Sequence, residues 1–191
     1  MNDVRTRLID ATFEEVFTNG YNGSSLANIL KTAAVKKGGM YHYFPSKKEM
    51  VISMIEEKLQ LRLENKWKKL ENIDTNIIDS FIESLLDIDN WNLKDGCPLG
   101  NLLQEPLKYD RDFASILSTI VENWKKQFIR ILQRAKERKE LNGDVNIEEC
   151  STFLIASIEG ALLLAKKYDD TTNFQACMNQ LTFYINTLRN H

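Results

Sequence analysis

The sequence predicts an all-α protein of about nine helices. Three observations predict this class: apolar residues recur with helical spacing, proline and glycine are scarce, and no segment alternates apolar and polar residues as a strand does. The 191 residues include only three prolines and eight glycines, and 43% are hydrophobic, which suits a buried core. The longest wholly apolar run, Ala161–Ala165, is far shorter than the ~20 residues of a membrane helix. No membrane partner is therefore expected.

Cysteine usage and the N-terminal residues favour a cytoplasmic location. The chain opens with charged residues such as Asp3 and Arg5, unlike a secretory signal peptide. Its three cysteines are odd in number and lack C-x-x-C spacing, so they indicate neither a disulfide framework nor a zinc site. No metal and no cofactor is expected.

The first fifty residues predict three short helices. The first is expected over about residues 3–19 and ends at Gly20, because glycine readily adopts the left-handed conformation that closes a helix. Ser24 occupies the N-cap position before the second helix, which carries four apolar residues at helical spacing. The third helix is expected over about residues 37–43.

Apolar stripes predict six further helices. Pro45 ends the third helix, and Ser46 with Glu49 three residues later forms the pattern of a capping box. Residues 91–101 are expected to be irregular, since they contain two glycines and a proline. The fourth to ninth helices are expected over about residues 47–70, 75–90, 102–109, 112–139, 147–168 and 172–189.

The charges are unevenly distributed along the chain. The formal net charge is −2, yet residues 1–50 hold seven basic and five acidic side chains. No acidic residue lies between Glu15 and Glu49, and this window contains five lysines. An acid-free basic stretch on an acidic protein is the pattern expected for a nucleic acid partner. The alternative is a solvated surface whose acids lie elsewhere in the chain.

The segment Ser24–Tyr43 has the spacing of a helix-turn-helix. Its two helices are separated only by residues 34–36, and in this motif the second helix lies in the DNA major groove. Gly38 and Gly39 at the start of that helix cost about 1 kcal/mol each relative to alanine. Close approach to a phosphate or base would offset this cost, whereas in a core hairpin the glycines would only let helices touch. The lysines in the same segment favour DNA.

Residues 26–47, LANILKTAAVKKGGMYHYFPSK, resemble the N-terminal signature of the TetR family of bacterial transcriptional regulators. The resemblance rests on the pattern V-x-K-G-x-x-Y-x-Y-F-x-x-K and on an upstream match at Phe17–Tyr21, and it covers about residues 3–55. It implies a DNA-binding domain over residues 1–46 and a ligand-binding and dimerisation domain over 47–191. Two positions depart from the pattern. Ala34 replaces the usual turn glycine, which suits only a negative φ, and Gly39 replaces a hydroxyl residue.

The resemblance also implies a DNA-binding surface. The serines before the second helix would bind a phosphate at its N-terminus, and the start of the third helix would face base edges. Its aromatic end would contact phosphates, sugars or thymine methyls, and the lysine that opens the fourth helix would pair with a phosphate. Met40 and Phe44 are expected in the core. The implied DNA-binding residues are Ser24, Ser25, Lys36, Lys37, Gly38, Gly39, Tyr41, His42, Tyr43 and Lys47.

The last two predicted helices favour a homodimer. Small residues at helical spacing let helices approach closely, and two helices from each of two chains make a common symmetric interface. One helix-turn-helix also reads few bases alone, whereas a twofold pair spans two half-sites. The alternative is that these faces pack inward. The predicted interface residues are Ser157, Gly160, Ala161, Leu164, Cys177, Leu181, Tyr184 and Leu188.

The middle helices predict a pocket for a small-molecule effector. They contribute large apolar side chains, among which a few polar groups such as Glu159 would orient an apolar ligand. The alternative is that the aromatic stripe is ordinary core packing. The predicted pocket residues are Phe81, Trp91, Leu102, Gln104, Phe113, Trp124, Phe128 and Ser157.

Cys97 is a candidate thiol sensor. Its surroundings, DGCPLGNL, resemble a Gly-Cys-x-x-Gly-Asn segment of one branch of the family, in which some members sense electrophiles or oxidants. The unpaired amides of a helix start lower the pKa of a thiol, and a nearby Lys166 would favour the thiolate further. The alternative is an inert, buried thiol at a structural helix start.

Taken together, the residues predict a ligand-responsive regulator, most simply a repressor released from a palindromic double-stranded DNA operator by a small molecule or an electrophile. Two alternatives remain. An all-α enzyme is disfavoured because the chain shows no P-loop, H-E-x-x-H or G-x-S-x-G pattern, and no catalytic residue is predicted. A helical interaction protein without sequence-specific DNA binding would show no preference for one DNA sequence.

Overall fold

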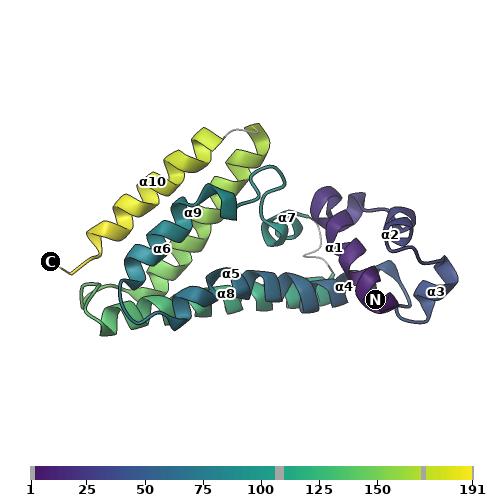
Figure 1. The fold of residues 1–191 in the computed structure, drawn as a ribbon, viewed down its shortest axis with the longest axis horizontal. Helices are drawn as coiled ribbons and strands as arrows, with labels where there is room; N and C mark the ends of the chain where they lie inside the picture. The colour runs from purple at the N-terminus through teal and green to yellow at the C-terminus, as the bar shows by residue number, and fades with distance from the viewer. Residues whose placement is uncertain (1–2, 106–109, 169–170, 191) are drawn as a thin grey trace. The chain divides into compact units, whose positions relative to one another are not determined.

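The computed structural model describes residues 3–105, 110–168 and 171–190. Figure 1 shows the helices in chain order, and no strand occurs in the part of the chain described. They are α1 (Val4–Gly23), α2 (Leu26–Thr32), α3 (Lys37–Tyr41), α4 (Lys47–Met54), η1 (Ile55–Leu59), α5 (Gln60–Asn72), α6 (Ile77–Leu86), η2 (Ile88–Asn90), α7 (Pro98–Gln104), α8 (Arg111–Glu137), α9 (Ile147–Tyr168) and α10 (Thr171–Thr187).

The all-α prediction is confirmed, and the predicted helix over residues 47–70 is one continuous rod. It comprises α4, the π-helical turn η1 and α5, because Met54, Ile55 and Gln60 all keep right-handed helical backbone angles. The predicted helix over residues 75–90 is shorter: α6 ends at Leu86, and η2 follows as a separate 3-10 turn. The predicted 102–109 helix is displaced, since α7 begins at Pro98, inside the stretch predicted to be irregular, and ends at Gln104; residues 106–109 lie outside the described part of the chain.

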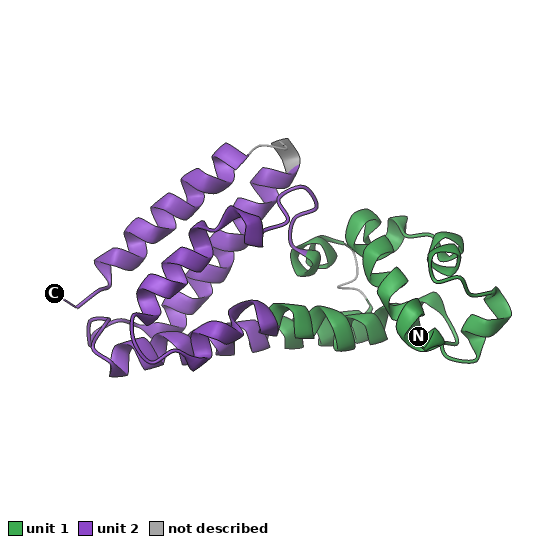
Figure 2. Ribbon diagram, viewed as in Figure 1, with its two compact units in different colours: residues 1–63, 98–120 green, residues 64–97, 121–191 purple. Residues whose placement is uncertain are grey.

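The chain divides into two compact units (Figure 2). Unit 1 comprises residues 1–63 and 98–120, and unit 2 comprises residues 64–97 and 121–191. The predicted domain boundary lies at residue 46. In the structure, unit 1 also includes the first half of the rod, α7 and the first part of α8, so the helix-turn-helix folds together with segments that are distant in sequence.

In unit 1, α1 packs against α2 and α4 around a core of aliphatic and aromatic side chains. Met40 and Phe44 are buried, as predicted, together with Leu8 and Phe13 of α1. Each such side chain contributes roughly 1.5–3 kcal/mol relative to an exposed position. These contacts fix α3 against the rest of unit 1 by its inner face and leave its outer face to solvent.

The helix ends of unit 1 largely follow the predicted capping residues. Gly20 has φ 72°, which confirms it as the left-handed stop of the first regular helix. Ser46 caps α4 by accepting a hydrogen bond from the Glu49 amide at 3.1 Å, as the capping box requires. The predicted N-cap Ser24 is wrong: Ser25 caps α2, and its hydroxyl accepts from the amide of Asn28.

The core of unit 2 is an aromatic cluster. Trp67 of α5 packs against Phe81, Trp91 and Phe128, with ring centroids 5.0–6.0 Å apart. Trp91 also contacts Phe174 of α10 at 5.4 Å. The tilted and edge-to-face geometry adds roughly 0.5–1.5 kcal/mol per pair beyond the burial itself. The cluster therefore ties α5, α6, α8 and α10 together.

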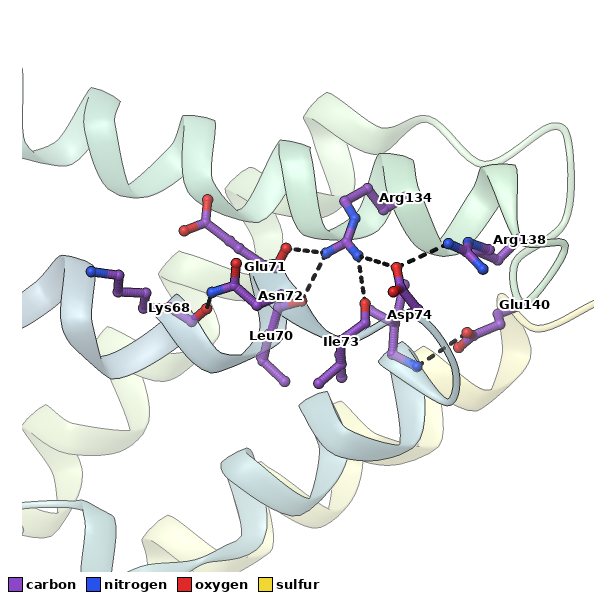
Figure 3. Close-up of polar contacts among 10 residues, drawn as sticks. Lys68, Leu70, Glu71, Asn72, Ile73, Asp74, Arg134, Arg138 and Glu140 are labelled. Carbon is purple, nitrogen blue, oxygen red and sulfur yellow. Dashed lines mark hydrogen bonds and ion pairs between the residues drawn. The ribbon is translucent and has the colours of Figure 1, made fainter.

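A polar cluster closes one end of unit 2 (Figure 3). Arg134 of α8 donates to the backbone carbonyls of Leu70, Glu71 and Ile73, at and just after the C-terminal end of α5. The last carbonyls of a helix lack intrahelical partners, so the guanidinium satisfies groups that would otherwise be orphaned. Asp74 pairs with both Arg134 and the neighbouring Arg138.

The same end of unit 2 fixes the start of α6. The Glu140 carboxylate accepts hydrogen bonds from the amides of Ile77 at 3.1 Å and Ile78 at 2.9 Å. A carboxylate at a helix N-terminus satisfies free amides and interacts favourably with the helix dipole. Asn76, which would be the local N-cap, makes no capping side-chain hydrogen bond. The cap therefore comes from 63 residues further along the chain.

Candidate DNA-binding site and effector region

The turn between α2 and α3 is strained at Ala34. Its φ is 53°, in the left-handed region, so the condition under which alanine suits this turn, a negative φ, is not met. The turn is fixed by the Ala34 amide, which donates to the Lys31 carbonyl at 3.1 Å, and by the Val35 amide, which donates to Leu30 at 3.0 Å. Arg7 adds a guanidinium hydrogen bond to the Ala33 carbonyl at 2.8 Å. These contacts hold alanine in a conformation that suits glycine.

Replacing Ala34 by glycine is therefore expected to stabilise the protein by roughly 0.5–1 kcal/mol. The left-handed conformation costs an L-residue roughly 1–2 kcal/mol, and the extra freedom of glycine in the unfolded chain offsets about half of this. Urea unfolding of the A34G variant measures the change. The control is A27G at the exposed second position of α2, where glycine is expected to cost up to about 1 kcal/mol. Destabilisation of both variants by similar amounts would contradict the strain at Ala34.

The outer face of α3 has the composition of a DNA-reading surface. Tyr41 and Tyr43 are 52% and 46% exposed, which places both among the exposed large apolar side chains of the described residues. His42, Lys36 and Lys37 are exposed beside them, and neither lysine has an ion pair within the described residues. Exposed basic side chains and aromatic rings grouped along one short segment are typical of contacts to phosphates, sugars and base edges.

The two glycines of α3 have different surroundings. A Cβ at Gly38 would meet no atom within 4 Å, whereas one at Gly39 would lie 3.2 Å from the Val35 side chain. Gly39 is therefore explained by packing within the turn. The protein itself gives no packing reason for glycine at Gly38, which is solvent-exposed on the outer face.

Two of the five lysines in the acid-free window are already engaged. Lys48 pairs with Asp110 at 2.8 Å and with Asp112 at 2.6 Å, and these hydrogen bonds raise the pKa of its ammonium. Lys47 donates to the carbonyls of Tyr21 at 2.6 Å and Ser24 at 2.7 Å. For Lys48, therefore, the alternative holds that the neutralising acids lie elsewhere in the chain. Its partners lie more than sixty residues further along the chain, where local sequence reasoning cannot detect them.

The predicted phosphate role of Lys47 also needs correction. Its ammonium lies 4.6 Å over the Tyr21 ring in addition to its two carbonyl acceptors. Burial lowers its pKa, and the charges of Glu105 and Glu15 act in the opposite direction. All the observed contacts of this side chain lie within unit 1. Lys47 therefore links the start of α4 to the end of α1.

The N-terminus of α2 already holds a carboxylate. Glu15 of α1 accepts hydrogen bonds from the Ser25 amide at 2.9 Å and from the Asn28 side chain at 3.2 Å. The Ser24 hydroxyl is buried and donates to the Tyr21 carbonyl. A phosphate at this point would meet the Glu15 charge, so the structure does not support Ser24 and Ser25 as a free phosphate site. The sequence offered no signal for Glu15, because a glutamate on a surface helix is ordinary.

The predicted effector-pocket residues are divided between the two units. Leu102 and Phe113 are buried in unit 1, and Gln104 is exposed there, its amide donating to the Gly100 carbonyl of its own helix. The remaining five belong to unit 2. Four of them are the aromatic residues Phe81, Trp91, Trp124 and Phe128, which contact other rings of the unit 2 core. Ser157 is partly exposed on α9.

Polar atoms without partners lie buried in unit 2. Among the described residues, the indole N–H groups of Trp67 and Trp124 and the Glu159 Oε1 atom are buried and make no hydrogen bond. Buried polar groups are normally paired, and an unpaired one costs roughly 1–3 kcal/mol. Thr182 Oγ1 is a further buried atom of unit 2 without a partner, so the hydrogen-bonding capacity of these groups is unused within the protein.

Cys97 is buried, and its side chain is hydrogen-bonded to Glu159. The thiol is 7% exposed, and burial raises the pKa of Glu159, while the Cys97 hydrogen bond lowers it in part. Burial covers the Cys97 sulfur, which limits its access to an electrophile. Lys166 is exposed on α9. The arrangement matches the inert, buried alternative for Cys97 better than the sensor.

The predicted dimer residues lie on α9 and α10 with mixed exposure. Ala161 and Leu181 are buried inside unit 2, so their side chains pack within the protomer, which corrects the prediction for these two. Gly160 and Leu164 are exposed, while Ser157, Cys177, Tyr184 and Leu188 are partly exposed. The large apolar side chains of this surface that the sequence analysis missed are Phe153, Leu163 and Phe183, the last of which is 68% exposed.

The described residues show neither a metal-binding cluster nor a helix that could cross a membrane. No group of three or more histidine, cysteine, aspartate or glutamate side chains is placed to hold a metal ion there. Within the same residues, every helix is too short or too polar to span a membrane.

A helix-turn-helix with an exposed basic and aromatic reading helix, followed by a larger all-α region, defines a DNA-binding regulator of transcription. Residues 8–54 match the family described as "Bacterial regulatory proteins, tetR family", and residues 76–181 match "Tetracyclin repressor-like, C-terminal domain". The chain belongs to the TetR family of transcriptional regulators and is not an enzyme. Repression and response to a ligand are typical of this family.

Individual relatives agree with this assignment. An uncharacterised HTH-type regulator in the lacX 3′ region of Lactococcus lactis is 28% identical over 179 residues, covering 89% of this chain and 87% of the relative. The transcriptional regulator AcuR of Cereibacter sphaeroides is 27% identical over 170 residues, covering 83% and 74%. The crystal structure of reduced NemR from E. coli shares the fold, with a TM-score of 0.85, 21% identity and coverage of 98% and 97%.

Proposed function

We propose that this regulator is a homodimeric repressor that binds a palindromic operator through α3 and leaves it when a small molecule binds the effector domain. Residues 1–46 form the DNA-binding domain and residues 47–191 the effector and dimerisation domain. The observation that carries the proposal is the outer face of α3, where two lysines without acidic partners in the described structure stand beside exposed Tyr41 and Tyr43. The protein would act in the cytoplasm, where its operator lies.

The apolar surface of α9 and α10 supports the homodimer. Phe153, Leu163 and Leu164 of α9 and Phe183 of α10 are all exposed, and a Cβ at Gly160 would meet no other atom within 4 Å. Large exposed apolar side chains grouped on paired helices mark an interaction surface. A twofold copy would cover this surface and place two α3 helices on one operator.

The buried donors and acceptor of unit 2 support a small-molecule effector rather than an electrophile. Trp67, Trp124 and Glu159 supply unpaired polar atoms that a ligand can satisfy. Cys97, in contrast, is buried and hydrogen-bonded to Glu159, which limits its access to an electrophile. The dimer would have one arrangement of protomers that fits the operator and one that does not. The ligand would shift the equilibrium towards the second, by a free energy equal to the difference between its binding free energies for the two arrangements.

Selection of genomic fragments on the purified protein tests the proposal. We expect enrichment of one sequence with twofold symmetry, half-sites about one helical turn apart and two protomers per site. Recovery of bulk DNA without a common sequence would contradict sequence-specific binding. A single protomer on each selected fragment would contradict the dimer.

Gly38 provides a sharper test of the reading helix. The G38A variant is expected to be slightly more stable than the wild type, by roughly 0.5 kcal/mol, because alanine favours a helix and the added methyl meets no protein atom. Its operator affinity is nevertheless expected to fall about tenfold, since the methyl occupies the surface that approaches DNA; tenfold corresponds to about 1.4 kcal/mol. The control is G143A, whose added Cβ also lies in open space. Unchanged operator binding by G38A would remove Gly38 from the interface.

A further inference from the structure

The end of α1 is held by a residue that lies far away in the sequence. The Glu105 carboxylate, directly after α7, accepts hydrogen bonds from the Tyr21 amide at 2.6 Å and the Asn22 amide at 2.9 Å. It also accepts one from the Asn22 side chain at 2.8 Å. One carboxylate thus receives three donors from two adjacent residues, all within unit 1. Hydrogen bonds to an ionised acceptor are about twice as strong as neutral ones.

The backbone at Gly20 is shaped to admit this carboxylate. Gly20 has φ 72° and ψ 174°, a conformation essentially restricted to glycine. A Cβ at this position would lie 2.5 Å from Glu105 Oε1, closer than real Cβ contacts occur. Gly20 therefore ends the first helix and also leaves room for a carboxylate from another segment. The sequence shows only the first of these two roles.

The same short segment is also held by Lys47. The Lys47 ammonium binds the carbonyls of Tyr21 and Ser24, while Glu105 binds the amides of Tyr21 and Asn22. The Tyr21 ring packs edge-on against Phe113 of α8 at 4.8 Å. Residues 21–24 are thus fixed by a carboxylate, an ammonium and an aromatic contact at once, although they form only one turn.

This turn leads directly into the DNA-reading motif. Ser24 precedes Ser25, the N-cap of α2, so the position of residues 21–24 sets where α2 begins and how it is directed. Through the Ala34 turn, α2 in turn positions α3. Loss of the Glu105 carboxylate leaves two backbone amides and the Asn22 side chain without their acceptor, which frees the turn to shift.

We propose that Glu105 is the positioning residue through which the state of α7 controls the DNA-reading helices. With α7 in place, its carboxylate fixes residues 21–24 and hence α2 and α3; when α7 moves, this constraint disappears and the reading surface is no longer preorganised. The proposal rests on the proposed function, because it takes the operator as the ligand of α3. Coupling between two binding events is reciprocal, so operator binding must also stabilise α7.

Hydrogen–deuterium exchange of the full-length protein, with and without the selected operator, tests this coupling. In the wild type, the operator is expected to slow amide exchange in α3 and, by at least about fivefold, in α7. In the nearly isosteric E105Q variant, α3 remains protected by the operator while exchange in α7 no longer responds. Without DNA, E105Q is also expected to exchange the Tyr21 and Asn22 amides faster than the wild type.

The matched control is E14Q, which makes the same substitution at an exposed glutamate of α1 in the same unit. It is expected to behave as the wild type in every measurement. Two results would overturn the role of Glu105 while leaving the proposed function intact. In the first, the operator protects α3 of the wild type but does not slow exchange in α7. In the second, the operator still slows exchange in α7 in both E105Q and E105A. Absence of α3 protection by any DNA in the wild type would overturn both this role and the proposed function.

Discussion

Replacing Lys36 and Lys37 together by alanine is expected to weaken operator binding about 100-fold at moderate salt. A 100-fold loss corresponds to about 2.8 kcal/mol, or roughly 0.7 kcal/mol for each of the four cationic side chains that a dimer loses. The salt dependence of binding is expected to become shallower, by roughly 0.9 in the log–log slope for each phosphate that is no longer neutralised. Fluorescence anisotropy over a range of salt concentrations measures both quantities.

The chain offers a matched control for this variant. Lys68 and Lys69 of α5 are also adjacent, exposed lysines, and their double replacement changes the net charge by the same amount. The K68A/K69A variant is expected to lose little affinity and to keep the wild-type salt slope. Equal losses in the two double variants would mean that net charge, rather than the α3 face, governs binding to DNA.

Replacing Arg134 by alanine is expected to cause the largest loss of stability, about 3 kcal/mol. The guanidinium is only 29% exposed and binds the carbonyls of Leu70, Glu71 and Ile73, all of which lose this donor. For a protein of this size, 1 kcal/mol lowers the melting temperature by about 2–4 °C, so a decrease of about 6–12 °C is expected. Thermal unfolding followed by circular dichroism measures it.

The R138A variant distinguishes the contribution of the Asp74 ion pair from that of the carbonyl hydrogen bonds made by Arg134. It is 51% exposed and shares the Asp74 partner with Arg134. Exposed ion pairs contribute at most about 1 kcal/mol, so R138A is expected to shift the melting temperature by no more than about 4 °C. If R138A lowers the melting temperature as much as R134A does, the stabilising contribution of Arg134 comes from its ion pair with Asp74 and not from its hydrogen bonds to the end of α5.

The helices could be predicted from sequence because their causes are local. Gly20 ends the first helix through its own backbone freedom, and Ser46 caps α4 through an amide three residues away. The burial of Met40 and Phe44 agrees with what the family resemblance implies. The family signature, likewise local, was sufficient to predict a DNA-binding regulator.

Several of the errors involve interactions between distant segments. Lys48 was counted as a free cation, but Asp110 and Asp112 neutralise it from the start of α8. The start of α2 was assigned to a phosphate, but Glu15 already binds there. No periodicity or spacing indicates which of many surface carboxylates folds against a given lysine or amide.

The fold class, the positions of most helices and the reading helix of a TetR-family regulator could all be deduced from the order of the residues, because helix formation and capping depend on neighbours within one or two turns. Only the folded chain shows which charged side chains remain available to DNA and which are paired inside the protein. The folded chain also revealed that Glu105 holds the turn before α2. Such pairings depend on where folding brings distant groups together, and their energies come from geometry that no local pattern encodes.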